Sequence, residues 1–227
     1  GALAARGVSI FFSAGDGGTA GAATNCEIND GSRREAILAT FPATCPYVTV
    51  VGGLFNFPEE MATVYRSGYY SSGGISNYFQ RPSWQQAVVA KYLASPFVDI
   101  KARQMIQAGA TGRAFPDISA HGSRHDFFWN GTLHHYGGTS AAAPLAASVF
   151  ALVNDALAAK NEPSLGFLNP LIYSGKITQG FYDVVRGNTK GCGTLGFSAS
   201  PGFDLASGWG SPRFRPLLEA VWAVVRP

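Results

Sequence analysis

Ser140 stands in a segment whose residue types and spacing suggest covalent chemistry. The heptapeptide Gly138-Thr-Ser-Ala-Ala-Ala-Pro144 opens a long apolar run, Ser140 to Lys160, which predicts a helix beginning near the serine. A serine there presents its hydroxyl at the helix end, and its own N–H, which lacks a helical partner, points where an oxyanion would form. Such a serine can also be a simple N-cap. The small residues and the proline that follow favour the nucleophile interpretation.

The heptapeptide resembles the nucleophile motif of the subtilisin-like clan of peptidases. Subtilisins take their general base from a His-Gly-Thr-His type segment that lies far upstream of the serine. The four histidines of this chain, His121, His125, His134 and His135, come shortly before Ser140 instead. None of them fits the subtilisin pattern, and we interpret all four as loop or surface residues.

Asp16 indicates a different branch of that clan. It lies in the loop Ser13-Ala-Gly-Asp-Gly-Gly18, after a short apolar run, where subtilisins carry an asparagine that donates to the oxyanion. An aspartic acid can donate only when it is protonated, and its unperturbed pKa is about 3.9. An enzyme built this way must work in acid or raise that pKa by burial. This combination resembles the sedolisins, serine-carboxyl peptidases that include secreted acid endopeptidases and tripeptidyl-peptidases.

The resemblance runs essentially from end to end of the chain. Three further stretches carry it, namely Phe41 to Gly53, Ser71 to Pro82 and Arg113 to Ala120. It implies an α/β fold, a subtilisin-like parallel sheet flanked by helices and incomplete at the N-terminus. It also implies acid hydrolysis of peptide bonds by acyl transfer. Ser140 would attack the scissile carbonyl, while protonated Asp16 and the Ser140 N–H would bind the oxyanion.

The base of that family is absent from these 227 residues. Sedolisins use a Glu oriented by an Asp four positions later, a spacing that places both carboxylates on one helix face. None of the glutamates of this chain is followed by an Asp four positions later; they are Glu27, Glu35, Glu59, Glu60, Glu162 and Glu219. We therefore expect the pair on an N-terminal fragment of the same enzyme and expect this chain alone to be inactive. A member that has lost its base is the other interpretation.

Two aspartates near the C-terminus, Asp183 and Asp204, flank a Gly-rich stretch. Carboxylate and carbonyl oxygens suit Ca²⁺, although loop aspartates often only form turns. The family resemblance implies one structural Ca²⁺ here, with carboxylates from Asp183 and Asp204 and backbone carbonyls from Val184, Ser200 and Gly202.

Apolar runs and turn residues predict the elements that would position these groups. We expect buried parallel strands at Val8–Phe12 and Tyr47–Val51, joined through a helix-like piece at Arg34–Phe41. Asn130-Gly131 predicts a hairpin with a type I′ turn. The remaining expectations are a surface excursion over residues 66–86, short helix Gln85–Leu93, strand entry Arg113–Ala120 and terminal helix Phe214–Val225. We assign residues 1–177 to a core, 178–212 to the calcium-binding loop region and 213–227 to the terminal helix of one peptidase-domain portion.

The composition excludes several classes of protein. Hydrophobic residues make up 46% and charged residues 14% of the chain, which argues against a disordered chain or a coiled coil. The net charge is +3, and the densest basic spot is Arg33-Arg34, so we expect no nucleic-acid partner. Gly, Pro or a charged residue interrupts every apolar stretch of 18 residues, so the sequence predicts no transmembrane helix. We therefore expect no membrane partner. The expected partner is a peptide or protein substrate.

The three cysteines leave at least one unpaired within the chain. Cys26 and Cys45 are close enough in sequence to close a loop, and we take this pair as the expected disulfide. The alternative is a bridge from Cys26 to Cys192, with Cys45 left over. Asn130-Gly131-Thr132 is a glycosylation sequon, with Asn130 as the acceptor. These features favour a secreted protein, or one in an acidic vacuole or lysosome.

Three other functions stay open at this point. The first is a neutral subtilisin-type protease with an upstream histidine, which needs an Asn-like role for ionised Asp16. The second is a non-catalytic binding protein on a decayed peptidase fold, which would not react with a serine-directed aldehyde inhibitor. The third is a structural Ca²⁺-dependent domain, against which the intact Gly-Thr-Ser motif argues.

Overall fold

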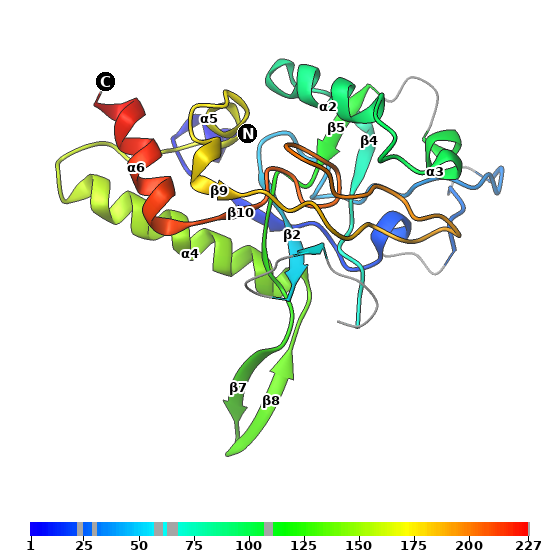
Figure 1. Ribbon diagram of the computed structural model, residues 1–227, viewed down its shortest axis with the longest axis horizontal. Helices are drawn as coiled ribbons and strands as arrows, with labels where there is room; N and C mark the ends of the chain where they lie inside the picture. The colour runs from blue at the N-terminus through cyan, green and yellow to red at the C-terminus, as the bar shows by residue number, and fades with distance from the viewer. Residues whose placement is uncertain (22–24, 29–30, 57–60, 63–67, 107–110, 227) are drawn as a thin grey trace.

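The computed structural model describes residues 1–21, 25–28, 31–56, 61–62, 68–106 and 111–226 (Figure 1). Its elements in chain order are α1 (Ala2–Ala5), β1 (Phe11–Ser13), η1 (Gly18–Ala20), β2 (Thr49–Phe55), β3 (Met61–Ala62), β4 (Gly74–Gln80), η3 (Ser83–Gln85), α2 (Gln86–Leu93), α3 (Ile100–Met105), β5 (Gly112–Phe115), β6 (Ile118–His121), β7 (His125–Trp129), β8 (Thr132–Tyr136), α4 (Thr139–Ala158), α5 (Asn169–Tyr173), η4 (Thr178–Gly180), β9 (Phe181–Tyr182), β10 (Ser211–Pro212) and α6 (Phe214–Val225).

A short, mostly parallel sheet forms the centre of the molecule. Strand β2 pairs in parallel with β1 on one side and with β6 on the other, and β3 adds antiparallel to the end of β2. Three of the seven β2 residues are β-branched and two are glycines, and all but Phe55 are buried, because elements cover both faces of this strand. The expected parallel α/β architecture is confirmed.

Helix α4 packs against this sheet and supplies a large part of the core (Figure 1). Ala142, Ala146, Phe150, Val153 and Leu157 recur at helical spacing and are all buried. By length and composition alone, α4 is the one helix among the described residues that could cross a membrane. The stripe that packs on the sheet accounts for this apolar character as that of a core helix.

Two expected segments differ from the structure. Residues 34–41 form no helix, because the backbone there bonds to neighbouring loops: Ala36 N donates to Cys26 O at 2.8 Å, and Leu38 N donates to Thr19 O at 2.9 Å. Part of the expected surface excursion at 66–86 is buried, over residues 71–76. Gly73 lets that backbone approach closely, since a Cβ there would lie 1.9 Å from Leu205 O. Residues 66 and 67 lie outside the described residues.

Most of the other local predictions are confirmed, but the buried strand expected at Val8–Phe12 is wrong in bounds and burial. Strand β1 covers Phe11–Ser13 and none of its residues is fully buried, because within the described sheet it pairs with β2 on one side only. Helices α2 and α6 begin and end within one residue of the expected bounds, and α4 covers most of its expected range. The hairpin of β7 and β8 turns at Asn130 and Gly131, whose φ angles of 48° and 74° are both in the left-handed region, as a type I′ turn requires.

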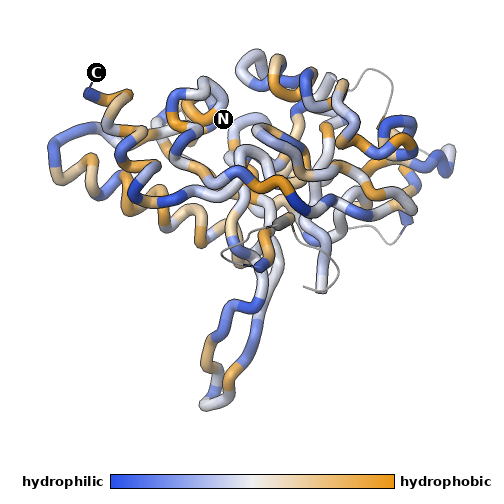
Figure 2. Tube along the Cα trace, in the orientation of Figure 1, coloured by the Kyte–Doolittle hydropathy of each residue, from blue (hydrophilic) through white to orange (hydrophobic). Residues whose placement is uncertain are grey.

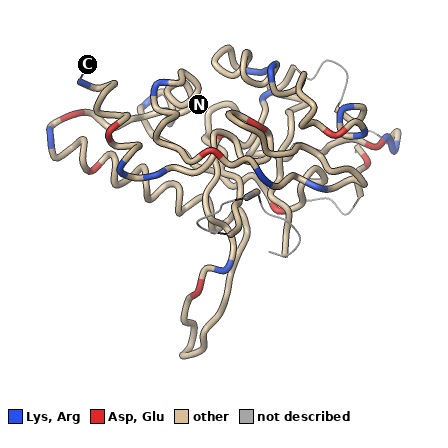
Figure 3. The backbone as a smooth tube through the Cα atoms, viewed as in Figure 1, with Lys and Arg blue, Asp and Glu red and all other residues tan. Residues whose placement is uncertain are grey.

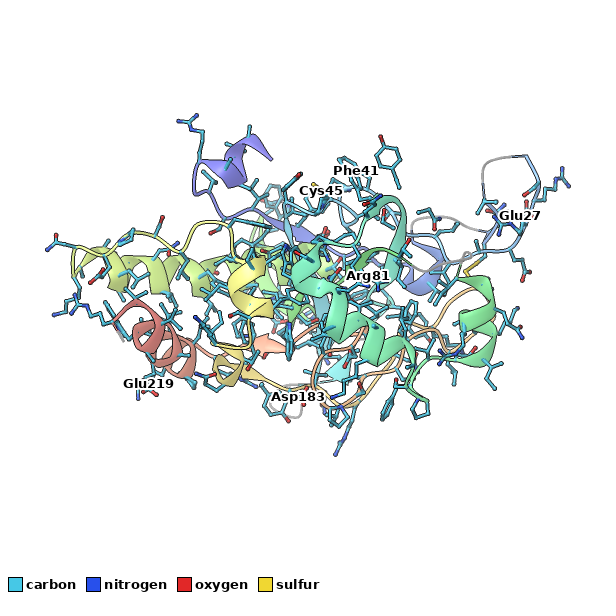
Figure 4. The ribbon with its side chains drawn as sticks, turned by 90° about the horizontal axis from the view of Figure 1, so that it is seen from above. Glu27, Phe41, Cys45, Arg81, Asp183 and Glu219 are labelled. Carbon is cyan, nitrogen blue, oxygen red and sulfur yellow. A yellow bond between two sulfur atoms is a disulfide. The ribbon has the colours of Figure 1, made fainter. Side chains whose placement is uncertain are left out.

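The disulfide joins Cys26 to Cys192, so the expected pairing of Cys26 with Cys45 is wrong. The loop that carries Cys26 packs against the C-terminal loops, where Thr19 N donates to Thr189 O at 3.0 Å. Cys45 is free and half-buried in the turn before β2, well apart from the disulfide, which lies near Glu27 (Figure 4).

A buried polar network holds the start of β6 in place. Arg113 and Asp117 form an ion pair at 2.5 Å with both side chains fully buried. Asp117 also accepts from Val50 N at 2.7 Å and from the Tyr173 hydroxyl at 2.8 Å. Its backbone carbonyl accepts from Trp209 N at 2.9 Å. The network thereby joins β2, α5 and the C-terminal loop around the turn that leads into β6.

Candidate active site

Ser140 is the second residue of α4 and is exposed at its N-terminal end. Gly138 precedes the helix with a φ of 119°, a conformation that L side chains rarely adopt. A Cβ at this position would lie 2.9 Å from Asp16 Oδ2. Glycine is therefore needed there both for the turn into the helix and for the close approach of Asp16.

Asp16 lies in the loop directly after β1 and meets the start of α4. Its Oδ1 accepts from Thr139 N at 2.7 Å and from the Thr139 hydroxyl at 2.9 Å. Thr139 Oγ1 in turn accepts from Gly15 N at 3.1 Å. The two residues that the sequence singled out, Asp16 and Ser140, are thus brought together through Thr139, 123 positions along the chain from Asp16.

The groups at this point can act on a carbonyl. In the described part of the chain, neither the Ser140 N–H nor Asp16 Oδ2 has a hydrogen-bond partner. An exposed hydroxyl, an unpaired helix N–H and a carboxyl oxygen therefore lie at one helix end. A nucleophile with adjacent hydrogen-bond donors that can bind an oxyanion is part of what acyl transfer requires.

Sequence reasoning missed the residues that hold the Asp16 loop. Gly15 O accepts from Ser72 N at 2.8 Å, and Gly17 N donates to Ser72 Oγ at 3.3 Å. Thr139 was overlooked as the link between Asp16 and the helix, although it stands inside the heptapeptide. Ser72 was harder to identify from the sequence than Thr139, because it lies in a Ser/Gly-rich stretch that was expected at the surface.

The four histidines lie on the hairpin and at its base. His135 Nδ1 is 2.6 Å from Asp126 Oδ1, and His125 Nε2 is 3.0 Å from His121 O. Among the described contacts, none joins an imidazole to Ser140. His134 and His135 are exposed, whereas His121 and His125 are half-buried in β6 and β7. Asn130 is exposed at the hairpin tip, which leaves the sequon accessible.

The five residues expected to bind calcium lie together in the C-terminal loops. Ser200 N donates to Asp204 Oδ2 at 2.8 Å, and Gly202 N donates to Asp183 Oδ2 at 2.9 Å. Ser207 Oγ lies 3.1 Å from Asp204 Oδ1 and 3.4 Å from Val184 O. Asp183 is exposed at the edge of the molecule, while Asp204 is buried (Figure 4).

The Asp204 carboxylate is buried without a cationic partner among the residues that the structure describes. Burial raises its pKa from the ordinary value to about 7, against hydrogen bonds from Ser200, Ser207 and Ala206 that favour the ionised form. Among the described ion pairs, none includes Asp204. No group of three His, Cys, Asp or Glu side chains lies together in the described chain, so a metal here would depend on backbone oxygens. Such a donor set fits a hard cation such as Ca²⁺.

Comparison with known proteins shows the family to which this chain belongs. The Subtilase family profile matches residues 2–166. Tripeptidyl-peptidase sed4 of Aspergillus fumigatus is 36% identical over 241 residues, which cover 97% of this chain and 39% of that protein. Tripeptidyl-peptidase SED2 of Arthroderma otae is 37% identical over 234 residues, which cover 96% of this chain and 37% of that protein.

The fold gives the same answer. A solved structure of Pseudomonas sedolisin, a serine-carboxyl proteinase in complex with pseudo-iodotyrostatin, superposes with a TM-score of 0.73 at 28% identity. The superposed region covers 97% of this chain and 57% of the sedolisin chain. The chain therefore belongs to the subtilase family of serine peptidases, and within it the similarity is to sedolisin and the tripeptidyl-peptidases. It spans 37–39% of the length of these curated relatives.

Proposed function

We propose that this chain carries the nucleophile and the oxyanion-binding groups of an acid serine-carboxyl peptidase. The observation that carries the proposal is the contact of Asp16 with Thr139, which sets a carboxyl group beside Ser140 at the start of α4. Ser140 Oγ attacks the scissile carbonyl carbon and loses its proton to a base. The oxyanion that forms accepts from the Ser140 N–H and from the protonated carboxyl of Asp16. Expulsion of the amine leaves an acyl-enzyme, which water hydrolyses.

The base in this proposal is a Glu that lies outside the chain. Two observations support this assignment of the base. The sequence contains no Glu-x-x-x-Asp, and among the described residues no histidine contacts Ser140. The N-terminal fragment that would supply the Glu and its Asp is then an obligatory partner, and this chain is inactive without it. Asp16, in place of a donor amide, disfavours a neutral subtilisin-type mechanism, and the intact nucleophile motif disfavours a purely binding protein.

The substrate is a peptide or protein. The names of the relatives favour release of tripeptides, and internal cleavage is the second candidate. A disulfide and an exposed sequon at Asn130 fit an oxidising compartment, so the proposed location is extracellular or an acidic vacuole or lysosome. Glycosylation of Asn130 stays a prediction.

One Ca²⁺ is the proposed cofactor. The carboxylates of Asp183 and Asp204 and the carbonyls of Val184, Ser200 and Gly202 would hold it, and its charge would compensate the buried Asp204 carboxylate. Its role would be structural, because these loops contribute no group to the reaction described above.

Replacement of the nucleophile tests the function. In the enzyme that contains this chain together with the Glu/Asp segment, Ser140→Ala should lower peptide hydrolysis about 10⁶-fold, by analogy with loss of a triad nucleophile. Hydrolysis should be measured from about pH 3 to about pH 8, a range that extends from below the ordinary carboxyl pKa to neutral pH. Circular dichroism should be recorded on each variant as a check on folding. Ser148→Ala is the matched control, because Ser148 lies on the same helix and bonds to Pro144 O at 2.8 Å. Retained activity in Ser140→Ala would refute the assignment.

A further inference from the structure

The hairpin of β7 and β8 projects away from the body of the molecule (Figure 1), and hydrophobic residues lie along it (Figure 2). The exposed fractions are 76% for Phe128, 71% for Trp129 and 54% for Tyr136. Large exposed apolar groups that lie next to one another commonly mark a binding surface. An isolated two-stranded hairpin is also marginally stable in water, so a partner would stabilise this one.

Both faces of the hairpin carry apolar side chains. Phe127 pairs with His134, the rings stacking at 5.6 Å, and on that same face Trp129 is opposite Thr132. Phe128 is opposite Leu133 on the other face. If the hairpin folded back onto the body of the molecule, only one of its two apolar faces would be buried. Apolar side chains on both faces therefore suit a partner that lies along the strands.

The hairpin is anchored beside the nucleophile. Its base is held by Gly138 N, which donates to Gly122 O at 2.7 Å. Strand β8 ends at Tyr136, and Ser140 follows four positions later. Five residues of strand extend about 17 Å, which is the reach of the hairpin from the helix end. A chain bound along it can therefore continue to Ser140.

The kind of partner follows from the open edges and the charge. In the described part of the chain, β7 and β8 pair only with each other, so each keeps an outer edge to which an extended polypeptide can add as a strand. Arg124 and Asp126 are the only Lys, Arg, Asp or Glu residues in 124–136 (Figure 3). The hairpin also carries three of the four histidines named above, but a single arginine is too few to hold nucleic acid or anionic lipid. Large apolar side chains dominate the exposed surface, which therefore fits apolar polypeptide segments.

We propose that the hairpin His125–Tyr136 is a secondary binding site for extended, apolar segments of polypeptide substrates, outside the residues bound at Ser140. The proposal rests on the proposed peptidase function, since it takes the occupant to be substrate. It makes the hairpin a determinant of preference for unfolded polypeptides over short peptides.

Two substrates of different length test the proposal. In the full enzyme, the double variants Phe128→Ser/Leu133→Ser and Phe127→Ser/Trp129→Ser each remove one apolar face. The rates to compare are kcat/KM on a chromogenic tripeptide amide and on a reduced, carboxymethylated protein. We expect a loss of about tenfold on the protein, mainly through KM, and an unchanged rate on the tripeptide amide. Thr132→Ser on β8 is the control, because it keeps the turn, the sequon and the apolar side chains, and it should behave as the unmodified enzyme.

A binding measurement separates this proposal from the peptidase assignment. Fluorescence anisotropy of a labelled, carboxymethylated polypeptide should report binding to the Ser140→Ala enzyme and about tenfold weaker binding after the hairpin changes. If the unmodified enzyme hydrolyses nothing, the peptidase function fails, while this measurement still reports on the hairpin. Equal losses on both substrates, or no change on either, would overturn the proposal. So would loss of self-association in the hairpin variants with polypeptide binding unaltered, because a second copy would then be the occupant.

Discussion

Thr139 connects the two candidate catalytic residues at the scale of single side chains. It donates from its backbone N–H and its hydroxyl to one oxygen of Asp16, and the hydroxyl also accepts from Gly15 N. Oδ1 is thereby engaged, which leaves Oδ2 as the oxygen that can carry a proton toward substrate. In the proposed mechanism this distinction would allow one carboxyl group to be both held in place and available to the oxyanion.

Asp16→Asn should change the pH dependence of hydrolysis. The amide can accept from Thr139 with its oxygen and donate to the oxyanion with its NH₂ at any pH, whereas the carboxyl donates only when protonated. We expect activity at neutral pH relative to acid pH to rise, and kcat/KM against pH is the measurement. Asp16→Ala serves as the control and should lose about 10²–10³ in kcat at acid pH, where the carboxyl donates, and less as the pH rises. An Asn variant with the unaltered profile would contradict an oxyanion role for Asp16.

Thr139→Val should weaken the positioning of Asp16. Valine retains the backbone bond and the shape but loses the hydroxyl that links Gly15 N to Asp16. We expect kcat to fall about tenfold with KM little changed, the order of one lost hydrogen bond. Thr139→Ser keeps the hydroxyl and should restore most of the rate. Equal activity in the two variants would rule out the hydroxyl as the positioning group.

At the scale of elements, the catalytic loop depends on contacts between distant loops. The Cys26–Cys192 disulfide spans 166 positions and joins the segment after η1 to the C-terminal loop. The backbone bond from Thr19 to Thr189 lies in the same region. Because η1 follows Asp16 directly, this tie limits the movement of the loop that carries the carboxyl group.

Cys192→Ser should destabilise the fold, since it removes a cross-link that closes a long loop in the unfolded chain. We expect a decrease of about 2–5 kcal/mol in the free energy of unfolding, measured by urea denaturation. Cys45→Ser is the matched control, because Cys45 forms no disulfide and its change should be much smaller. A larger effect of Cys45→Ser than of Cys192→Ser would show that the cross-link is not the stabilising element.

At the scale of the whole molecule, the C-terminal loops close over the body around a buried carboxylate. Asp204 lies between Ser200, Ala206 and Ser207, which all donate to it, and Asp183 caps Gly202 nearby. This cluster lies on the path from β9 to β10 and α6. An uncompensated negative charge there costs folding free energy that a bound cation would recover.

Chelation of calcium should lower the melting temperature of the enzyme. At a Ca²⁺ concentration about 100-fold above Kd, binding adds about 2.7 kcal/mol, which corresponds to roughly 5–10 °C for a domain of this size. Differential scanning calorimetry with EDTA and with added Ca²⁺ is the measurement. Asp204→Asn should abolish the response, while Glu219→Gln, an exposed change on α6 (Figure 4), should keep it. The same melting temperature with and without Ca²⁺ in the unmodified enzyme would rule out the site.

Local patterns in the sequence determined helix α4, the terminal helix, the type I′ hairpin and the apolar strand β2. Each depends on residues within about one element, such as the apolar spacing of Phe214–Val225 or the Asn130-Gly131 pair, whose backbone preferences act locally. The motifs around Ser140 and Asp16 were also legible, because small residues and glycines are required where a backbone must approach a reacting group.

The tertiary structure alone decided what depends on contacts between distant segments. Cys26 bonds to Cys192 because two loops far apart in the sequence pack together, which outweighs the short separation from Cys45. The segment 34–41 stays extended because neighbouring loops satisfy its backbone, which outweighs its helix-like composition. The tertiary structure also decided the contact of Asp16 with Thr139 and the projection of the hairpin beside Ser140. Both follow from the packing of β1, β2 and α4, which no local sequence pattern encodes.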